Sequence, residues 1–185
     1  MVCAIGDENG EIYEQVSLPT TTPKETIPKM IAYFRDKRID ALGIACFGPI
    51  ELDRDSEKYG YITTTPKLAW RDCDIVGQMQ EALHCPVGFD TDVNGSVLGE
   101  VTFGQAQGKK CVMYLTIGTG VGGGVMHQEQ LFPLIRKKLK EYINGYIVTD
   151  ELADMEHYVV PASLHDDQGI MGCLELARRA LENDH

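Results

Sequence analysis

Runs of apolar residues in the first half of the chain predict several β-strands. The run VCAIG at 2–6 is followed by the polar sequence DENG and by the alternating stretch 11–18. Asn-Gly is a preferred pair in tight β-turns, so these two runs predict a hairpin. The almost unbroken apolar run 41–48 fits a strand covered on both faces, and 86–92 predicts a strand that ends in acidic residues.

Helical spacing of apolar residues alternates with these runs. Thr22 precedes Pro23 and is followed three positions later by Glu25, so a helix with a capping box is predicted to begin here. The alternation of strands and helices predicts an α/β fold with a partly parallel sheet. Further helices are predicted at 74–84, 93–106, 128–146 and 168–183, and further strands at 111–118 and within 154–162.

Composition narrows the class of protein. The 185 residues suffice for one compact domain or two small ones, and the formal net charge is −11. Such an acidic chain is not expected to bind nucleic acid or an anionic membrane surface, because those partners select basic patches. The chain has no apolar run of membrane-spanning length and no start typical of a signal peptide. Its six cysteines are scattered without a C-x-x-C pair, which predicts reduced thiols in a cytoplasmic protein and gives no support for a zinc site.

The stretch FDTDVNGS carries the first candidate chemistry. Asp90 and Asp92 come at the end of a predicted strand, where ligands collect in open α/β sheets. A carboxylate there can accept the proton of a substrate hydroxyl that attacks phosphorus, and Asn94 can bind a neighbouring hydroxyl. The alternative is that Asp92 caps the following helix. The residue types favour the two interpretations equally.

The stretch TIGTGVGGGV at 116–125 is the second candidate for chemistry, as a phosphate-binding turn. A glycine-rich turn between a strand and a helix presents backbone N–H groups to phosphate oxygens, and Thr116 and Thr119 add hydroxyl donors. The pattern is neither a P-loop nor a dinucleotide fingerprint. A tight hairpin or a flexible linker is the alternative. Together the two stretches indicate phosphoryl transfer to an alcohol that the pattern does not identify.

Four segments carry a resemblance to a known family. FGPI (47–50), YGYITTTPK (59–67), TDVNGSVLGE (91–100) and LTIGTGVGGGV (115–125) resemble bacterial fructokinases of the ROK family, named for repressor, open reading frame and kinase. The resemblance implies an actin-like, ribonuclease-H-like sugar kinase fold that phosphorylates fructose at its 6-hydroxyl with ATP and Mg²⁺. Family members commonly dimerise, so it also implies a homodimer.

The resemblance also implies roles for individual residues. It makes Asp92 the general base and Asn94 a sugar contact, in a sugar-kinase lobe formed by 1–108. A shortened nucleotide-binding lobe would occupy 109–185. The sugar cleft would include Gly48, Pro49, Thr65 and Lys67, and the nucleotide would be held by Thr116, Gly118, Thr119, Gly120, Gly122, Gly123 and Gly124.

The chain departs from the family pattern in two places. In the family, the IGTG turn and the GGGV turn are separated by a long segment that contains an HPE…GH motif and a Cys/His zinc-binding loop, whereas here the two turns are fused. The family's acidic GGTK turn, which binds phosphate, has no counterpart before Met1. We therefore expect an incomplete second lobe and weak or no kinase activity. The alternatives are a non-catalytic sugar-binding or regulatory module and an internally deleted remnant.

Overall fold

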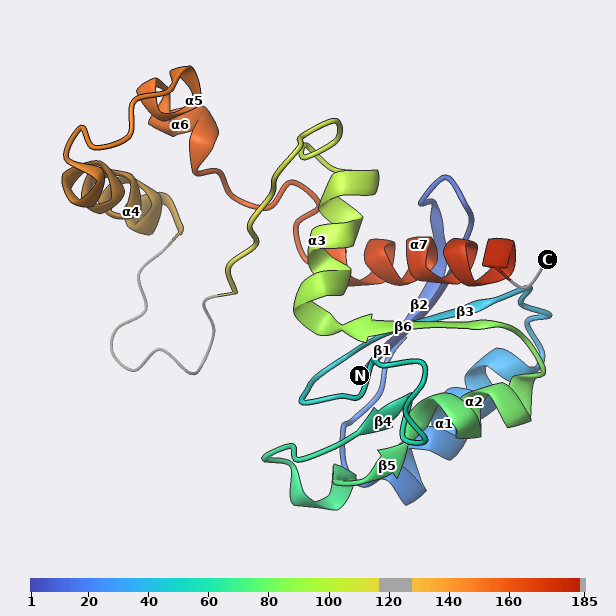
Figure 1. Cartoon of the computed structure of the whole chain (residues 1–185). Coiled ribbons are helices and arrows are strands. Elements are labelled where there is room, and N and C mark those ends of the chain that lie inside the picture. The colour runs from blue at the N-terminus through green and yellow to red at the C-terminus, as the bar shows by residue number, and fades with distance from the viewer. Residues whose placement is uncertain (117–127, 184–185) are drawn as a thin grey trace. The chain divides into compact units, whose positions relative to one another are not determined.

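A computed structural model describes residues 1–116 and 128–183 (Figure 1). The chain divides into two compact units, one made of Met1–Leu115 with Ser163–His185 and the other of Thr116–Ala162. This division differs from the predicted boundary between 108 and 109, because the C-terminal helix packs on the strands of the first unit. None of the helices in the described residues is long and apolar enough to cross a membrane.

The predicted N-terminal hairpin is confirmed. β1 (Val2–Gly6) pairs antiparallel with β2 (Ile12–Ser17). Asp7 closes the turn, since its Oδ1 accepts hydrogen bonds from the backbone amides of Asn9 (3.0 Å) and Glu11 (2.9 Å). Gly10 adopts a φ of 83°, a left-handed conformation that glycine reaches without strain.

α1 (Pro23–Arg35) begins where the sequence predicts, but the capping box is wrong. The Thr22 side chain makes no capping hydrogen bond. The fully buried Thr26 fixes the start of the helix instead, because its Oγ1 accepts from the Thr21 amide and donates to the carbonyl of Pro19, both at 3.3 Å. The residues of α1 that are buried in the core are Thr26, Ile27, Met30 and Phe34.

The centre of the first unit is the parallel pair of β3 (Leu42–Cys46) and β6 (Val87–Thr91). α7 (Gln168–Asn183) packs on this pair together with α3 (Asp92–Thr102), and α1 lies with α2 (Ile75–Leu83) on the opposite side (Figure 1). Glycine allows the close approach of α7, because a Cβ at Gly43 would collide with the Cys173 carbonyl. These strands and helices were all predicted, and the partly parallel sheet is confirmed.

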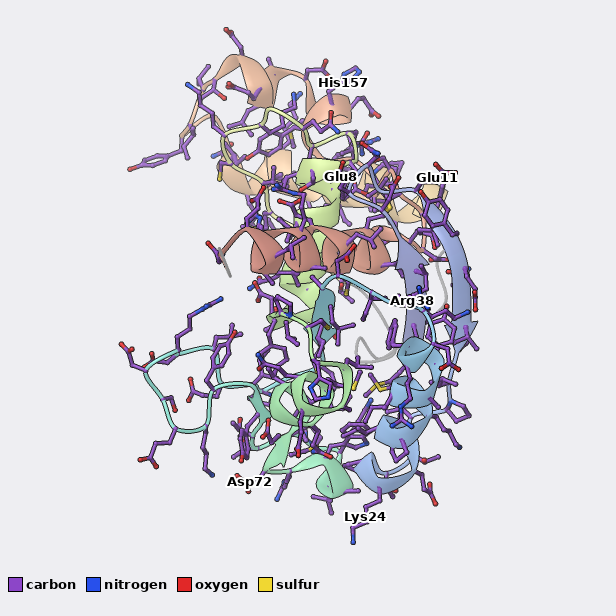
Figure 2. All side chains as sticks on the ribbon, turned by 90° about the vertical axis from the view of Figure 1, so that its right-hand side faces the viewer. Glu8, Glu11, Lys24, Arg38, Asp72 and His157 are labelled. Carbon is purple, nitrogen blue, oxygen red and sulfur yellow. The ribbon has the colours of Figure 1, made fainter. Side chains whose placement is uncertain are left out.

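The segment from residue 61 to residue 74 adds a short antiparallel strand pair and the buried Trp70 to the core. β4 (Tyr61–Ile62) pairs antiparallel with β5 (Cys73–Asp74), and the 3₁₀-helix η1 (Leu68–Trp70) lies between them in the chain. Trp70 is 1% exposed, and its indole Nε1 donates to the Thr21 carbonyl at 2.9 Å. Charged side chains such as Glu11, Lys24 and Asp72 project outward from the first unit (Figure 2).

In the second unit the regular elements among the described residues are helices. α4 (Gln128–Ile143) ends as predicted near Asn144 and Gly145, both with positive φ. α5 (Asp150–Ala153) and α6 (Met155–Tyr158) follow. The strand predicted within 154–162 is therefore wrong: Asp154 caps a helical turn by accepting from the His157 amide at 3.3 Å.

The strand predicted at 111–118 is also wrong for residues 111–116, which have no regular structure. Met113 is 83% exposed and Leu115 is 70% exposed, so the apolar run is not buried here. An apolar run becomes a strand only where another strand pairs with it. None of the strands in the described residues pairs with residues 111–116. Residues 117 and 118 lie outside the described residues.

Candidate functional site

The junction between β6 and α3 brings the acidic residues of the first candidate stretch together. Thr91 is the N-cap of α3, and its Oγ1 accepts from the Asn94 amide at 3.1 Å. Asp92 is therefore the first residue of the helix and not its cap. Its carboxylate is exposed, and its Oδ1 accepts from the Val93 amide at 2.9 Å. The positive end of the helix dipole favours a negative charge at this position.

Asp90 holds the neighbouring amide side chain in place. Its Oδ1 accepts from the Thr91 backbone amide and from Asn94 Nδ2, both at 2.7 Å. Asn94 is exposed, and this bond fixes the position of its side-chain amide. Sequence reasoning did not assign this role to Asp90. Asp90 lies in β6 and Asn94 in the first turn of α3, so the available signal was only that the two residues flank the predicted junction of strand and helix.

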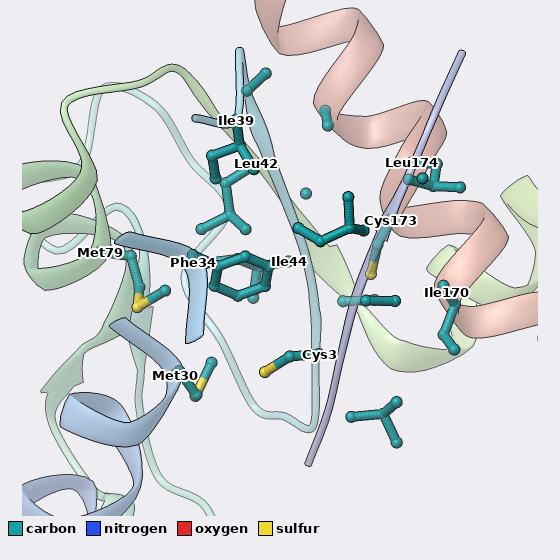
Figure 3. A pocket seen from close by; sticks show the side chains of 18 of the residues that line it. Cys3, Met30, Phe34, Ile39, Leu42, Ile44, Met79, Ile170, Cys173 and Leu174 are labelled. Atoms are coloured by element: carbon teal, nitrogen blue, oxygen red, sulfur yellow. The ribbon is translucent and has the colours of Figure 1, made fainter. Parts of the chain in front are cut away.

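A cavity of about 700 Å³ extends from this junction between β1 and β3, with side chains of α1, α2 and α7 on its walls (Figure 3). Its lining is mainly apolar, and Figure 3 labels Cys3, Phe34, Ile44 and Leu174 among the residues involved. The carboxyl end of β3 opens toward a polar group of lining residues, which consists of Lys67 and Asp92 beside Phe47. Thus Asp92 and Lys67, two of the predicted site residues, line one cavity.

The Lys67 ammonium group is held over an aromatic ring. Its Nζ lies 3.9 Å from the centroid of the Phe47 ring, a cation–π geometry, and Phe47 in turn packs edge-to-face on Trp70 at 5.6 Å. This stacking fixes a positive charge at the polar end of the cavity. Such a group can donate hydrogen bonds to a hydroxyl or a phosphate oxygen.

Thr65, Gly48 and Pro49 do not line the cavity but shape the loops beside it. Thr65 is 1% exposed, its Oγ1 accepts from the Lys67 amide at 3.3 Å, and its carbonyl accepts from Arg71 Nε at 2.9 Å. The Gly48–Pro49 peptide bond is cis, and the Pro49 carbonyl accepts from both the amide (2.8 Å) and the hydroxyl (3.1 Å) of Thr63.

The cysteine thiols beside the cavity are not charged at neutral pH. Burial, together with the nearby charge of Asp92, raises the pKa of Cys46 to about 12. Burial likewise raises the pKa of Cys3 to about 11. A thiol with such a pKa is a weak nucleophile near pH 7, so these residues are packing residues here.

The second candidate stretch is only partly visible. Thr116 is exposed and begins the second unit, whereas Gly118, Thr119, Gly120, Gly122, Gly123 and Gly124 lie outside the described residues. Within residues 1–116 and 128–183, no group of three His, Cys, Asp or Glu side chains could hold a metal ion.

Comparison with known proteins identifies the relatives of the chain. The profile of the ROK family matches residues 1–132. The fructokinase of Pediococcus pentosaceus is 31% identical over 277 aligned residues, which cover 98% of this chain and 95% of that protein. The fructokinase of Lactococcus lactis subsp. cremoris is 50% identical over 125 residues, which cover 68% of this chain and 42% of that protein.

These alignments also show what the relatives have in addition. The chain spans less than half the length of the Lactococcus lactis protein and of a putative fructokinase of Bacillus subtilis. The alignment with the Pediococcus protein extends over 277 positions, whereas this chain has only 185 residues. The relative therefore contains internal segments that have no counterpart here.

A solved structure establishes the fold. The inorganic polyphosphate/ATP-glucomannokinase from Arthrobacter sp. strain KM superposes with a TM-score of 0.64 and 18% sequence identity, covering 100% of this chain and 94% of that one. The chain has the actin-like α/β fold of sugar kinases, as the resemblance implied.

Proposed function

The chain belongs to the ROK family, and we propose that its site at the carboxyl ends of β3 and β6 binds fructose and transfers phosphate to it from ATP slowly. The product of this reaction is fructose 6-phosphate. The relatives named fructokinase support a hexose substrate, and the identity to the Lactococcus lactis enzyme supports fructose in particular. The slow rate is expected because the relatives contain segments that this chain lacks.

One observation carries the proposal: the Asp92 carboxylate lines the cavity while remaining exposed and without a basic partner. Among the residues that the structure describes, no lysine, arginine or histidine forms a salt bridge with it. As general base, Asp92 accepts the proton of the 6-hydroxyl while the hydroxyl oxygen bonds to the γ-phosphorus and ADP leaves. A positioned base contributes about 10²–10⁴ in rate.

The other predicted residues take supporting roles in this proposal. Asn94, held by Asp90, would bind a second sugar hydroxyl, and Lys67 would bind a hydroxyl or phosphate oxygen. Gly48, Pro49 and Thr65 would shape the sugar side of the site through the loop contacts described above. The glycines of 118–124 and Thr116 would hold the phosphates of ATP.

Mg²⁺ would enter with the nucleotide. The donor set of the described residues fits this ion poorly as a resident metal, because no three carboxylate or imidazole groups come together. Mg²⁺ is commonly bound by one or two carboxylates together with substrate phosphates and water, and it neutralises phosphate charge when bound. Asp92, at the polar end of the cavity, would be the carboxylate available to such a complex.

A second candidate function, sugar binding without catalysis, is favoured by the division of the chain. All the residues proposed to meet the sugar belong to the first unit, whereas the glycine stretch belongs to the second. Phosphoryl transfer requires the two to be aligned, and alignment supplies several kcal/mol of the barrier reduction. A site that binds sugar within one unit does not need that alignment.

Calorimetry with a product assay distinguishes these functions. The purified chain is titrated with fructose alone and with the ATP analogue AMPPNP in the presence of Mg²⁺, and fructose 6-phosphate is then measured after incubation with ATP. We expect binding of both ligands and slow formation of product. Fructose binding without product would support the second candidate, and failure of fructose to bind would refute both. Turnover at the rates of ordinary kinases, about 1–100 s⁻¹, would refute the slow step.

A further inference from the structure

Two opposite charges line the polar end of the cavity without forming an ion pair. They are the Lys67 ammonium group and the Asp92 carboxylate. Besides burial, which raises it most, the pKa of the Cys46 thiol responds to both charges: Asp92 raises it and Lys67 lowers it. Both charges therefore lie near the same sulfur. Within residues 1–116 and 128–183, however, neither belongs to a salt bridge.

The main chain of Lys67 is fixed on both sides. Its amide donates to Thr65 Oγ1 at 3.3 Å, and its carbonyl accepts from the Trp70 amide at 2.8 Å, at the start of η1. Thr65 is itself held, because its carbonyl accepts from Arg71 Nε at 2.9 Å. The start of the Lys67 side chain therefore stays in place, and the flexible four-carbon stem alone decides where the ammonium group lies.

The Phe47 ring determines where that stem points. Phe47 follows directly after β3, and its ring is partly buried against the core. Lys67 Nζ lies 3.9 Å from the centre of this ring. The negative face of an aromatic ring attracts a cation at such a distance. The ring therefore competes with the carboxylate of Asp92 for the same ammonium group.

Trp70 in turn fixes the Phe47 ring. The two rings pack edge-to-face, with centres 5.6 Å apart and planes at 83°. Trp70 is buried, and its indole Nε1 donates to the Thr21 carbonyl. Such an aromatic pair contributes more than the apolar area that it buries. A continuous series of contacts thus leads from Thr21 through Trp70 and Phe47 to the charge of Lys67.

The two possible partners of Lys67 are close in strength. An exposed cation–π contact and an exposed ion pair between lysine and aspartate each contribute little, and by similar amounts. The ring therefore changes the ratio of two populations by about two- to fivefold. The carboxylate of Asp92 does not depend on Lys67, because the Val93 amide and the amino-terminal end of α3 already favour its negative charge.

A free carboxylate and a paired one differ as bases. A nearby cation favours the charged form of a carboxylate, so a paired carboxylate accepts a proton less readily. A general base must accept the proton of the attacking hydroxyl. With Lys67 over the ring, the Asp92 oxygens stay open to that hydroxyl, and the ammonium group can donate to a different oxygen of the substrate.

We propose that Phe47, held by Trp70, is a positioning residue that keeps the Lys67 ammonium group over its ring and out of an ion pair with the Asp92 carboxylate. This inference rests on the proposed function, since it explains how one site offers a base and a cation at the same time. It adds a role for Phe47, which acts through Lys67.

Carbon NMR of aspartate carboxyl groups tests this placement without sugar or nucleotide. The full chain is labelled with ¹³C at aspartate Cγ, and Asp92→Asn identifies the Asp92 signal by its loss. We expect Phe47→Leu to lower the pH at which Asp92 takes up its proton by about 0.3–0.7 units, because a two- to fivefold larger paired population stabilises the charged form. Phe47→Tyr keeps the ring and should leave this pH unchanged.

The neighbouring titratable groups stay the same throughout the comparison. Asp90 at the end of β6 and Cys46 at the end of β3 lie beside Asp92, and Cys173 of α7 lies near Cys46. Every variant except the one used for assignment retains these three groups and Asp92. A difference between variants therefore reports on Lys67.

Lys67→Met shows whether the ammonium group causes the shift. In the unmodified chain this substitution should move the Asp92 titration by less than about 0.2 pH unit, because no ion pair is lost and salt screens the remaining interaction. Adding Phe47→Leu to Lys67→Met should then have no further effect. A shift that persists in the double variant, or a larger shift from Lys67→Met alone, would overturn the proposal.

Tyr59 offers a matched control. It is also partly buried against the core, and the guanidinium carbon of Arg54 lies 5.6 Å from its ring centre, but neither residue lines the cavity. Tyr59→Leu should leave the Asp92 titration unchanged, and a shift equal to that of Phe47→Leu would refute the specific role of Phe47. Should Phe47→Leu fail to fold, the ε-methylene protons of Lys67 in the unmodified chain must resonate upfield, as protons over an aromatic face do, and their absence there would refute the contact.

Product formation separates this proposal from the proposed function. With ATP and fructose, Phe47→Leu should lower kcat about two- to fivefold, Phe47→Tyr should not, and Phe47→Leu should have no further effect beside Lys67→Met. The expected NMR shifts without product from any of the proteins would support the positioning of Lys67 and refute the kinase function. Product formation without an NMR shift in Phe47→Leu would refute the positioning and leave the kinase function standing.

Discussion

Glu100 offers the sharpest test of how the C-terminal helix is joined to the first unit. This carboxylate is 5% exposed, and its Oε1 accepts from the amides of Ser163 (2.7 Å) and Leu164 (2.9 Å). Its Oε2 accepts from Ser163 Oγ at 2.6 Å. Glu100 in α3 therefore fixes the segment that leads into α7, which covers β3 and β6.

Two substitutions at Glu100 should differ strongly in their effect. Glu100→Ala leaves two amides without an acceptor, each costing about 1–3 kcal/mol, so the free energy of unfolding should fall by about 2–6 kcal/mol. Glu100→Gln keeps an oxygen for both amides, and its Nε2 can donate to Ser163 Oγ. Its cost should be about 1–2 kcal/mol, because neutral hydrogen bonds replace charge-assisted ones.

Urea denaturation measures this difference. The single tryptophan, Trp70, is buried and serves as the fluorescence probe, with far-UV circular dichroism as a second one. Ser163→Ala is the control, since it keeps both amide bonds to Glu100 and removes only the hydroxyl, which also accepts from the Gln105 amide at 2.8 Å. It should cost about 1–2 kcal/mol. Equal destabilisation by Glu100→Ala and Glu100→Gln would refute the reasoning, because the acceptor geometry would then not matter.

Three further predictions follow from local contacts. Burial raises the pKa of Cys3 to about 11 and that of Cys46 to about 12 in the folded chain. Above pH 9 these two thiols therefore bind fewer protons in the unfolded chain than in the folded chain. Urea titrations should therefore show unfolding free energy falling from pH 9 upward by up to about 1.4 kcal/mol per pH unit for each thiol, and less steeply in Cys46→Ala; a flat profile would contradict this. Gly43→Ala should lower the melting temperature measurably, as its Cβ meets the Cys173 carbonyl, whereas Gly108→Ala, in open space but with φ of 72°, should cost only about 1 kcal/mol; similar losses would argue against close packing of α7. Thr91→Ala should cost about 1 kcal/mol by removing the N-cap of α3, and Thr91→Ser should restore it in the same melt.

The elements that the sequence predicted well are those with local signals. The hairpin turn needs only Asp7, Asn9 and Gly10, and the helix at 168–183 follows from its own apolar spacing. The runs at 111–118 and 154–162 were misjudged because an apolar run becomes a strand only beside another strand, which the run itself does not specify. The packing of α7 on the first unit was missed for a similar reason, since it depends on contacts far apart in the sequence.

In the candidate site, too, the features with a local sequence signal were predicted and those that depend on side-chain conformation or packing were not. Asp92 was predicted to lie at the end of a strand because strand, acidic residues and helix follow one another directly. That Thr91 caps the helix and frees the Asp92 carboxylate depends on side-chain rotation, which residue types left open. Thr65 is buried in its own turn, where its Oγ1 accepts from the Lys67 amide, and its place at the sugar stays a prediction.

The central claim is that the Asp92 carboxylate acts as the general base on a bound hexose. The direct measurement is the rate of fructose 6-phosphate formation from radiolabelled ATP by the unmodified chain and by Asp92→Asn, both produced in a host without its own fructokinase. The account predicts a decrease of about 10²–10⁴ in kcat, with the fructose KM changed less than about threefold. Equal rates for the two proteins would contradict it.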